Sequence, residues 1–200
     1  AAAGAGYNRP MGPPDGNLFK VRSLLLGATG IALCSAGINI FAHYDAVRPD
    51  GADRLLLLSQ FTALPFLLSV IVAPIATAGL IAKRWRHAAA TALLASLLVA
   101  GSIYMSFGVG RRIRHDAFVA LAVRSTTLVD AIKAFESQHG RSPDSLGALV
   151  PEFLPSVPAT GMGAYPEYRY LIPKDGTYSR NPWILVVDTP VGIPDFDRFV

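Results

Sequence analysis

Charged residues are scarce in this chain of 200 residues, because only 16% are Asp, Glu, Lys or Arg while 52% are hydrophobic. No Glu occurs before Glu136, and residues 55–82 contain no ionisable side chain at all. Soluble domains carry about 25% charged residues, so this composition excludes an ordinary soluble protein. It predicts a membrane protein.

The chain also lacks the residue patterns that mark common catalytic sites. Its single cysteine, Cys34, excludes an internal disulfide, and no cluster of cysteines or histidines is present. His-Glu-x-x-His, Gly-x-Ser-x-Gly and a phosphate-cradling glycine loop are all missing. We therefore predict a protein that is not an enzyme and that binds neither a metal nor a cofactor.

Three long apolar runs dominate the N-terminal half. They cover residues 23–44, 55–82 and 88–108, and each reaches the roughly 20 residues that a helix needs to cross a bilayer. The expected organisation is a flexible tail over residues 1–20, a three-helix transmembrane domain over 21–110 and an outer domain over 111–200. Pro65 and Pro74 each remove an intrahelical hydrogen bond, so the second span is expected to kink.

Orientation follows from the Lys and Arg residues that flank the spans, although six fall on each side. The turn between the second and third spans, residues 83–87 (KRWRH), is short and free of acidic residues, whereas the turn between the first two spans carries three Asp. The positive-inside rule then favours a cytoplasmic N-terminus. We expect a multi-pass inner-membrane protein with its C-terminal domain in the periplasm.

Small residues recur at four-residue spacing in the first and third spans, which allows helices to approach closely. They are Ala28, Ala32 and Ala36 in the first span and Ala92, Ser96 and Ala100 in the third. Two interpretations remain open. These faces either close a self-contained three-helix bundle or dock against the helices of other membrane subunits.

Three polar residues lie about five positions from the same end of their spans: Asn39, Gln60 and Tyr104. At a rise of about 1.5 Å per residue they share one depth, roughly 7 Å from the membrane boundary. A polar layer that links the helices is the main expectation, since unsatisfied polar groups are costly in hydrocarbon. A quinone, haem or pigment pocket is the alternative, with His43 as the histidine nearest to this layer.

Beyond the third span, Gly108 and Gly110 are expected to interrupt the helix. The basic run at residues 111–115 suits lipid headgroups rather than nucleic acid, because no basic face with aromatic platforms follows. Residues 113–139 then predict an amphipathic helix that stops at Gly140. Its apolar stripe consists of Phe118, Leu121, Leu128, Ile132 and Phe135.

The remaining chain predicts a small α+β layer. Ser142 and Pro143 have the residue types of a helix start, so a short second helix is expected up to Val150. Strands are expected at 168–172, 183–188 and 197–200, with a turn at 174–177, forming an antiparallel meander packed on the apolar stripe. Four aromatic residues either form a contact surface or simply cover the sheet: Tyr165, Tyr168, Tyr170 and Trp183.

Residues 131–135 (AIKAF), 139–143 (HGRSP), 149–151 (LVP) and 153–155 (FLP) follow one another in an order that resembles the globular domain of type II secretion pseudopilins. The resemblance covers roughly residues 111–200, and the three-span part does not match that family. It implies a pseudopilin-like outer domain, in which the third span and the 113–139 helix stand in for the family's long helix. Three acids near the C-terminus, Asp188, Asp195 and Asp197, have no spacing that fits a calcium loop.

These features predict a non-catalytic accessory subunit of a larger membrane complex, with the lipid bilayer and other membrane subunits as partners. Two alternatives remain at this stage. One is a secretion or pilus-related factor that works through the pseudopilin-like domain, and the other is a membrane subunit that binds a quinone, haem or pigment.

Overall fold

The computed structural model describes residues 16–173, 181–189 and 198–199. Its helices are α1 (Gly16–Val47), α2 (Arg54–Gln60), α3 (Ala63–Gly79) and α4 (Arg86–His139). Three helical stretches, Leu18–Val47, Arg54–Gly79 and Arg86–His139, are long and apolar enough to cross a membrane. The predicted three spans are confirmed, and the chain is a multi-pass membrane protein.

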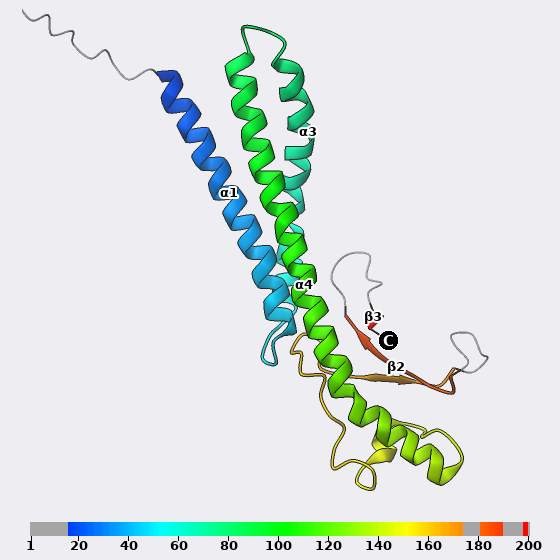
Figure 1. Ribbon diagram of the computed structural model, residues 1–200. Helices are drawn as coiled ribbons and strands as arrows, with labels where there is room; N and C mark the ends of the chain where they lie inside the picture. The colour runs from blue at the N-terminus through cyan, green and yellow to red at the C-terminus, as the bar shows by residue number, and fades with distance from the viewer. Residues whose placement is uncertain (1–15, 174–180, 190–197, 200) are drawn as a thin grey trace, which may run out of the picture.

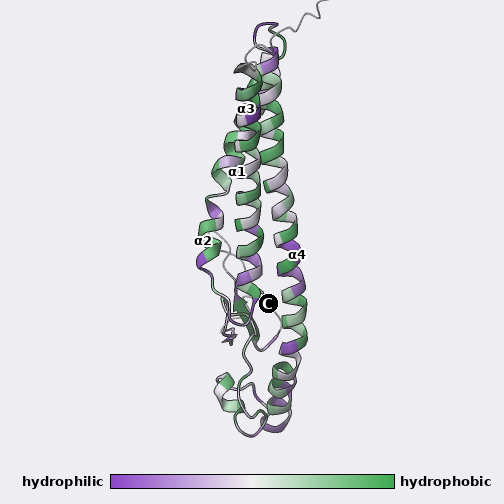
Figure 2. Cartoon of the chain, turned by 90° about the vertical axis from the view of Figure 1, so that its left-hand side faces the viewer, coloured by the Kyte–Doolittle hydropathy of each residue, from purple (hydrophilic) through white to green (hydrophobic). Residues whose placement is uncertain are grey.

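The helices α1 and α4 run in the same direction, with α3 packed antiparallel on α4 (Figure 1). Ala28 and Ala32 of α1 are buried against Val99 and Ile103 of α4. Apolar residues cover most of the length of the three spans, whereas polar residues gather at the α3–α4 turn and along the lower part of α4 (Figure 2). We call the end of the spans nearest the sheet the domain side, and the end with the α3–α4 turn the far side.

The six small residues singled out in the first and third spans lie largely at the contact between α1 and α4. Ala28, Ala32 and Ser96 are buried, whereas Ala36, Ala92 and Ala100 are half-buried. Their small side chains let these two helices pack within one chain. Gly30 and Gly37 instead point away from the rest of the chain, because a Cβ built on either meets nothing within 4 Å.

The second span is divided into α2 and α3, which confirms the predicted kink. Pro65 has no N–H to donate to the carbonyl of Phe61, and its ring would crowd that carbonyl. The chain tightens there into hydrogen bonds from residue i to residue i−3, with Thr62 N–H donating to Ser59 O at 3.0 Å. The hydroxyl of Thr62 donates to the same carbonyl at 2.6 Å. Pro74, in contrast, remains inside α3.

The helix of the third span, α4, is continuous over 54 residues, so the prediction that Gly108 and Gly110 interrupt it is wrong. Gly110 is buried and serves a close approach instead, because a Cβ on it would lie 2.3 Å from Cδ2 of His43. The helix ends at Gly140, whose φ of 69° is left-handed, as the sequence predicted. One unbroken helix, α4, therefore runs from the third span to the residues beside the sheet (Figure 1).

The short second helix is smaller than predicted and begins later. It is a 3₁₀ turn, η1, over Leu146–Leu149, and Ser145 rather than Ser142 precedes it. The Ser142 hydroxyl donates to Glu136 Oε1 at 2.6 Å, so it bonds back to α4 instead of capping a new helix. Pro143 is buried. This segment therefore wraps the end of α4.

A small antiparallel sheet follows, in the order β1–β2–β3. Its strands are β1 (Arg169–Leu171), β2 (Ile184–Asp188) and the two-residue β3 (Arg198–Phe199). Tyr170 pairs with Leu185, and Asp188 pairs with Arg198. The predicted meander is confirmed in these pairings, whereas the predicted turn at 174–177 and the acids Asp195 and Asp197 lie outside the described residues.

Two apolar clusters pack the residues that follow α4, including the sheet, against this helix. The upper cluster joins the ends of α1 and α2 to α4, to residues 162–165 and to β2, and the lower cluster joins α4 to η1, to residues 153–154 and to the sheet. The predicted stripe of α4 is divided between them. Phe118 and Leu121 contribute to the upper cluster, and Leu128, Ile132 and Phe135 contribute to the lower one.

Candidate functional site

The predicted polar layer is only partly assembled. Asn39 is 1% exposed in the contact between α1 and α4, but Tyr104 is 64% exposed and points away from the helices. Gln60 is exposed too, and its Nε2 donates to Leu56 O of its own helix at 3.4 Å. The structure therefore does not bring these three side chains into one buried layer.

His43 lies one helical turn beyond Asn39, and its ring is buried against Gly110. Within the described part of the chain, neither His43 Nδ1 nor Asn39 Oδ1 has a hydrogen-bond partner. No group of three or more His, Cys, Asp or Glu side chains among the described residues is arranged to hold a metal ion. Asn39 and His43 are the two cofactor candidates that share one buried face.

The aromatic residues predicted as a contact surface belong to the two cores. Tyr165 is 3% exposed, so its prediction as a surface contact is wrong, and it instead packs in the upper cluster with residues of α1, α2 and α4. Tyr168, Tyr170 and Trp183 are half-buried on the lower cluster. Of the two interpretations left open, these side chains follow the one in which they cover the sheet.

Burial raises the pKa of Tyr168 above its usual value, although the Arg124 guanidinium acts in the opposite direction. Burial also raises the pKa of Tyr170, where the hydrogen-bonding influence of Ser142 opposes it. Both phenols therefore stay neutral over the physiological pH range. Neither is suited to act as a base.

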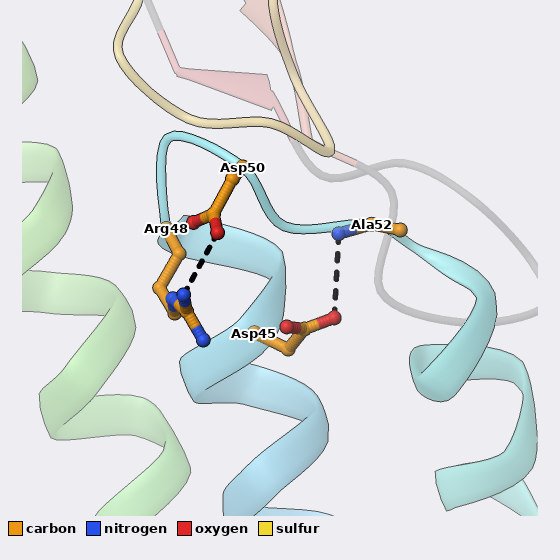
Figure 3. A network of polar contacts seen from close by, with 4 residues as sticks. All are labelled: Asp45, Arg48, Asp50 and Ala52. Carbon is orange, nitrogen blue, oxygen red and sulfur yellow. Dashed lines mark hydrogen bonds and ion pairs between the residues drawn. The ribbon is translucent and has the colours of Figure 1, made fainter.

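A network of polar contacts lies where α1, α2 and α4 meet the residues that precede the sheet, and it includes the turn between α1 and α2 (Figure 3). Arg48 Nη2 pairs with Asp50 Oδ2 at 2.9 Å, and Asp45 Oδ2 accepts the Ala52 N–H at 3.3 Å. The turn is so tight that a Cβ on Gly51 would lie 1.6 Å from Asp45 O. Its shape is therefore fixed by a glycine and two carboxylates.

Residues 160–165, which we call the clamp loop, lie directly on this turn. Gly163 N–H donates to Arg48 O at 2.6 Å, and Ala164 N–H donates to Ala46 O at 3.4 Å. A Cβ on Gly163 would lie 2.2 Å from Gly51 O, so only glycine permits this contact. The clamp loop thus bonds, backbone to backbone, to the end of the first span.

The other side of the clamp loop is bonded to α4. Arg124 Nε donates to Thr160 O at 2.9 Å. Thr160 is fully buried, and its hydroxyl accepts the Met162 N–H at 3.2 Å while donating to Tyr165 O. Gly161 takes a left-handed φ of 76°, which makes the sharp bend between these contacts possible.

Arg114 ties a third segment to the same place. Its Nη1 donates to Tyr165 Oη at 3.2 Å, its Nη2 donates to Thr189 O at 3.3 Å, and its guanidinium lies 5.1 Å from the centre of the Phe118 ring. The basic run predicted to contact lipid is therefore split. Arg111, Arg112 and His115 are exposed, whereas Arg114 is half-buried in the protein.

Sequence reasoning missed the contact between the clamp loop and the α1–α2 turn. It also missed the two arginines of α4, Arg114 and Arg124, that bond to the clamp loop. The turn at residues 48–52 and the loop at 160–165 are more than 100 residues apart, and neither contains a motif that names the other. The glycines at 51, 161 and 163 were the one available signal. They mark close backbone approach but do not identify the partner.

Comparison of the chain with protein-family models, with curated proteins and with solved structures finds no match in any of the three.

Proposed function

We propose that this chain is a non-catalytic subunit of a larger membrane protein complex, in which the spans hold the outer domain in a fixed orientation at the membrane face. The observation that carries the proposal is the clamp loop. It is bonded to α1 through Ala46, to the α1–α2 turn through Arg48 and to α4 through Arg124. In this proposal the protein resides in the inner membrane, with the N-terminus cytoplasmic and the domain periplasmic.

Fixed orientation is useful for assembly rather than for anchoring alone. A flexible tether would be enough to keep a domain near a membrane, whereas a preorganised surface lowers the entropic cost when a partner docks. Each hydrogen bond of the clamp contributes about 1 kcal/mol. The bonds to Arg48, Ala46, Thr160, Tyr165 and Thr189 therefore hold the domain by several kcal/mol.

The surface offered to a partner is apolar and lies on α4 just beyond the span. Val119 and Val123 are 52% and 71% exposed, and their spacing of four residues places them on one face of the helix. Leu171 and Ile172 add exposed apolar area at β1. We infer that these residues, rather than the tyrosines packed in the two clusters, make the contact.

Extraction of the chain in lipid nanodiscs from its native membrane, followed by native mass spectrometry, tests this function. The expected result is one partner at fixed stoichiometry, lost in Val119→Asp/Val123→Asp and kept in Val109→Asn, which alters a 40% exposed position of the same helix on the span. A wild-type chain that is released only as a monomer would overturn the proposal.

A second candidate follows from the continuity of α4. If the outer domain is pseudopilin-like, α4 corresponds to the family's long helix, ended by Gly140 and followed by a small sheet. The apolar half of α4 is already packed against α1 and α3, so this role is as a secretion-related factor and not as a filament subunit. Cysteine crosslinking from Val123→Cys to a co-expressed pseudopilin tests it, and the absence of any adduct argues against it.

The buried Asn39 and His43 favour a third, ligand-binding function. Their unpartnered Oδ1 and Nδ1 atoms, within the described residues, suit a polar group of a quinone, haem or pigment. An absorption spectrum and a lipid extract of the purified protein test this function. A colourless protein without quinone would exclude it.

A further inference from the structure

A groove of about 370 Å³ opens between α1, α3 and α4 in the far half of the spans. Its walls include Leu24 and Gly27 of α1, Ser69 and Val72 of α3, and Ser96 and Val99 of α4. Figure 1 shows α1 diverging from α3 and α4 toward the far side, so the helices do not close into a sealed bundle there. The groove has the volume of a small-ligand site.

The walls of the groove offer no free polar group. Ser69 Oγ donates to Pro65 O at 2.7 Å, and Ser96 Oγ donates to Ala92 O at 2.8 Å, so each hydroxyl is satisfied within its own helix. All the other lining residues are apolar or glycine. Such a surface suits an alkyl chain, because a polar ligand would lose its own hydrogen bonds on entering.

The far ends of the helices that line the groove carry exposed cations. Lys20 precedes Leu24 by four residues and therefore lies one helical turn beyond it on the same face of α1. Lys83 and Arg84 occupy the α3–α4 turn, and all three cations are exposed. No Asp or Glu occurs in residues 16–44 or 63–115, so nothing within these segments neutralises them.

We propose that this groove binds an anionic phospholipid from the leaflet on the far side, with an acyl chain along the groove and the headgroup in the basic region formed by Lys20 of α1 and by Lys83 and Arg84 of the α3–α4 turn. Lys20 lies about 6 Å beyond the end of the groove, the direction in which a headgroup follows its chains. Basic residues over a gap between transmembrane helices recognise anionic headgroups. The proposal rests on the membrane placement of the spans and is independent of the proposed function.

Charge is tested first, with the purified full chain in nanodiscs of phosphatidylcholine containing phosphatidylglycerol. Native mass spectrometry gives the ratio of the two lipids retained by the protein. Each cation at the membrane surface contributes roughly a fivefold preference, so Lys20→Gln/Lys83→Gln is expected to lower the retained ratio about 30-fold. The control Arg111→Gln/Arg112→Gln removes the same charge at the domain side and is expected to leave the ratio unchanged.

Shape is tested with two glycines of α1. A Cβ on Gly27 or on Gly37 meets nothing within 4 Å, so a side chain can start at either position without a clash, but only Gly27 lines the groove. Gly27→Leu is expected to lower lipid retention at least tenfold, whereas Gly37→Leu retains lipid like the wild type. A thermal midpoint equal to that of Gly37→Leu shows that Gly27→Leu has folded.

Three outcomes would overturn the proposal. The first is equal retention of both lipids by the wild type, which would show that the cations select nothing. The second is unchanged retention in both the Lys20→Gln/Lys83→Gln and the Gly27→Leu variants. The third is a dimer that Gly27→Leu dissociates, because the groove would then hold a second copy of the chain.

Discussion

Gly163→Ala probes the contact between the clamp loop and the first span with the addition of one methyl group. The new Cβ would lie 2.2 Å from Gly51 O and 2.6 Å from Gly51 N, both backbone atoms of a tight turn. The distance between the new Cβ and Gly51 O must increase from 2.2 Å to at least 3.0 Å, so the clamp loop must move away from the turn by at least 0.8 Å. That movement lengthens the 3.4 Å bond from Ala164 N–H to Ala46 O beyond hydrogen-bonding range.

The cost combines two effects. Overpacking costs about 1–3 kcal/mol, and each lost hydrogen bond costs about 1 kcal/mol, so we expect a destabilisation of about 3 kcal/mol. For an outer domain of this size that lowers the unfolding midpoint by more than about 10 °C. Trp183 fluorescence in a Trp85→Phe background reports the transition, because these are the only two tryptophans.

Gly147→Ala is the matched control, since its Cβ would lie 3.6 Å from Ser145 Oγ in an ordinary contact. It is expected to shift the midpoint by no more than about 3 °C. Spin labels on the outer domain and on α1 add a second readout, with a broadened distance distribution expected only in Gly163→Ala. A midpoint and a distance distribution equal to the wild type in Gly163→Ala would refute the reasoning that the clamp fixes the domain.

Three further predictions concern single buried positions. Burial raises the pKa of Tyr168 above 10.0 in the folded state. The contribution of the neutral phenol to the free energy of unfolding is therefore complete below pH 10 and is lost as the pH rises through the folded pKa. In a series of unfolding measurements at alkaline pH, Tyr168→Phe should show a smaller loss of stability than the wild type. Leu149→Ala removes a fully buried side chain and should cost about 2–5 kcal/mol in denaturant unfolding; a cost below 1 kcal/mol would contradict the lower cluster. Gly110→Ala should push α1 away from α4 at His43 and lower the thermal midpoint in nanodiscs, whereas Gly108→Ala, with open space around its Cβ, should leave it unchanged.

The spans, the stop of α4 and the strands were predictable because their signals are local. Apolar length identifies a membrane span, Gly140 tolerates the left-handed conformation, and β-rich runs such as residues 184–188 read as strands without knowledge of their neighbours. The break before Pro65 belongs to the same class, since the missing N–H acts on a carbonyl four residues away. Each of these features is decided within one or two turns of chain.

The errors arose where a contact outside the local residue pattern decides the conformation. Gly110 has the residue type of a helix breaker, but the His43 ring occupies the space that its missing side chain leaves, and the helix continues. Ser142 has the residue type of a cap, but its hydroxyl donates a hydrogen bond to Glu136 Oε1. Tyr165 suits an exposed contact, yet it accepts a hydrogen bond from Arg114 in the upper cluster. None of these partners follows from periodicity or propensity.

The two ends of the spans differ in how firmly they are held together. On the domain side, the ring of His43 packs on Gly110, the α1–α2 turn is closed by Asp45, and the clamp loop joins this turn to α4 through Arg124. On the far side, α1 leaves α3 and α4 (Figure 1). The groove of about 370 Å³ lies between these helices. Deformation of the helix packing therefore costs less at the far side, where fewer contacts must be broken. Under the lipid proposal, a lipid that enters the groove spreads the far ends, while the hydrogen bonds at the domain side keep the ends of α1 and α4 joined. Under the proposed function, the packing of the spans can therefore adjust within the membrane while the domain that partners contact keeps its orientation.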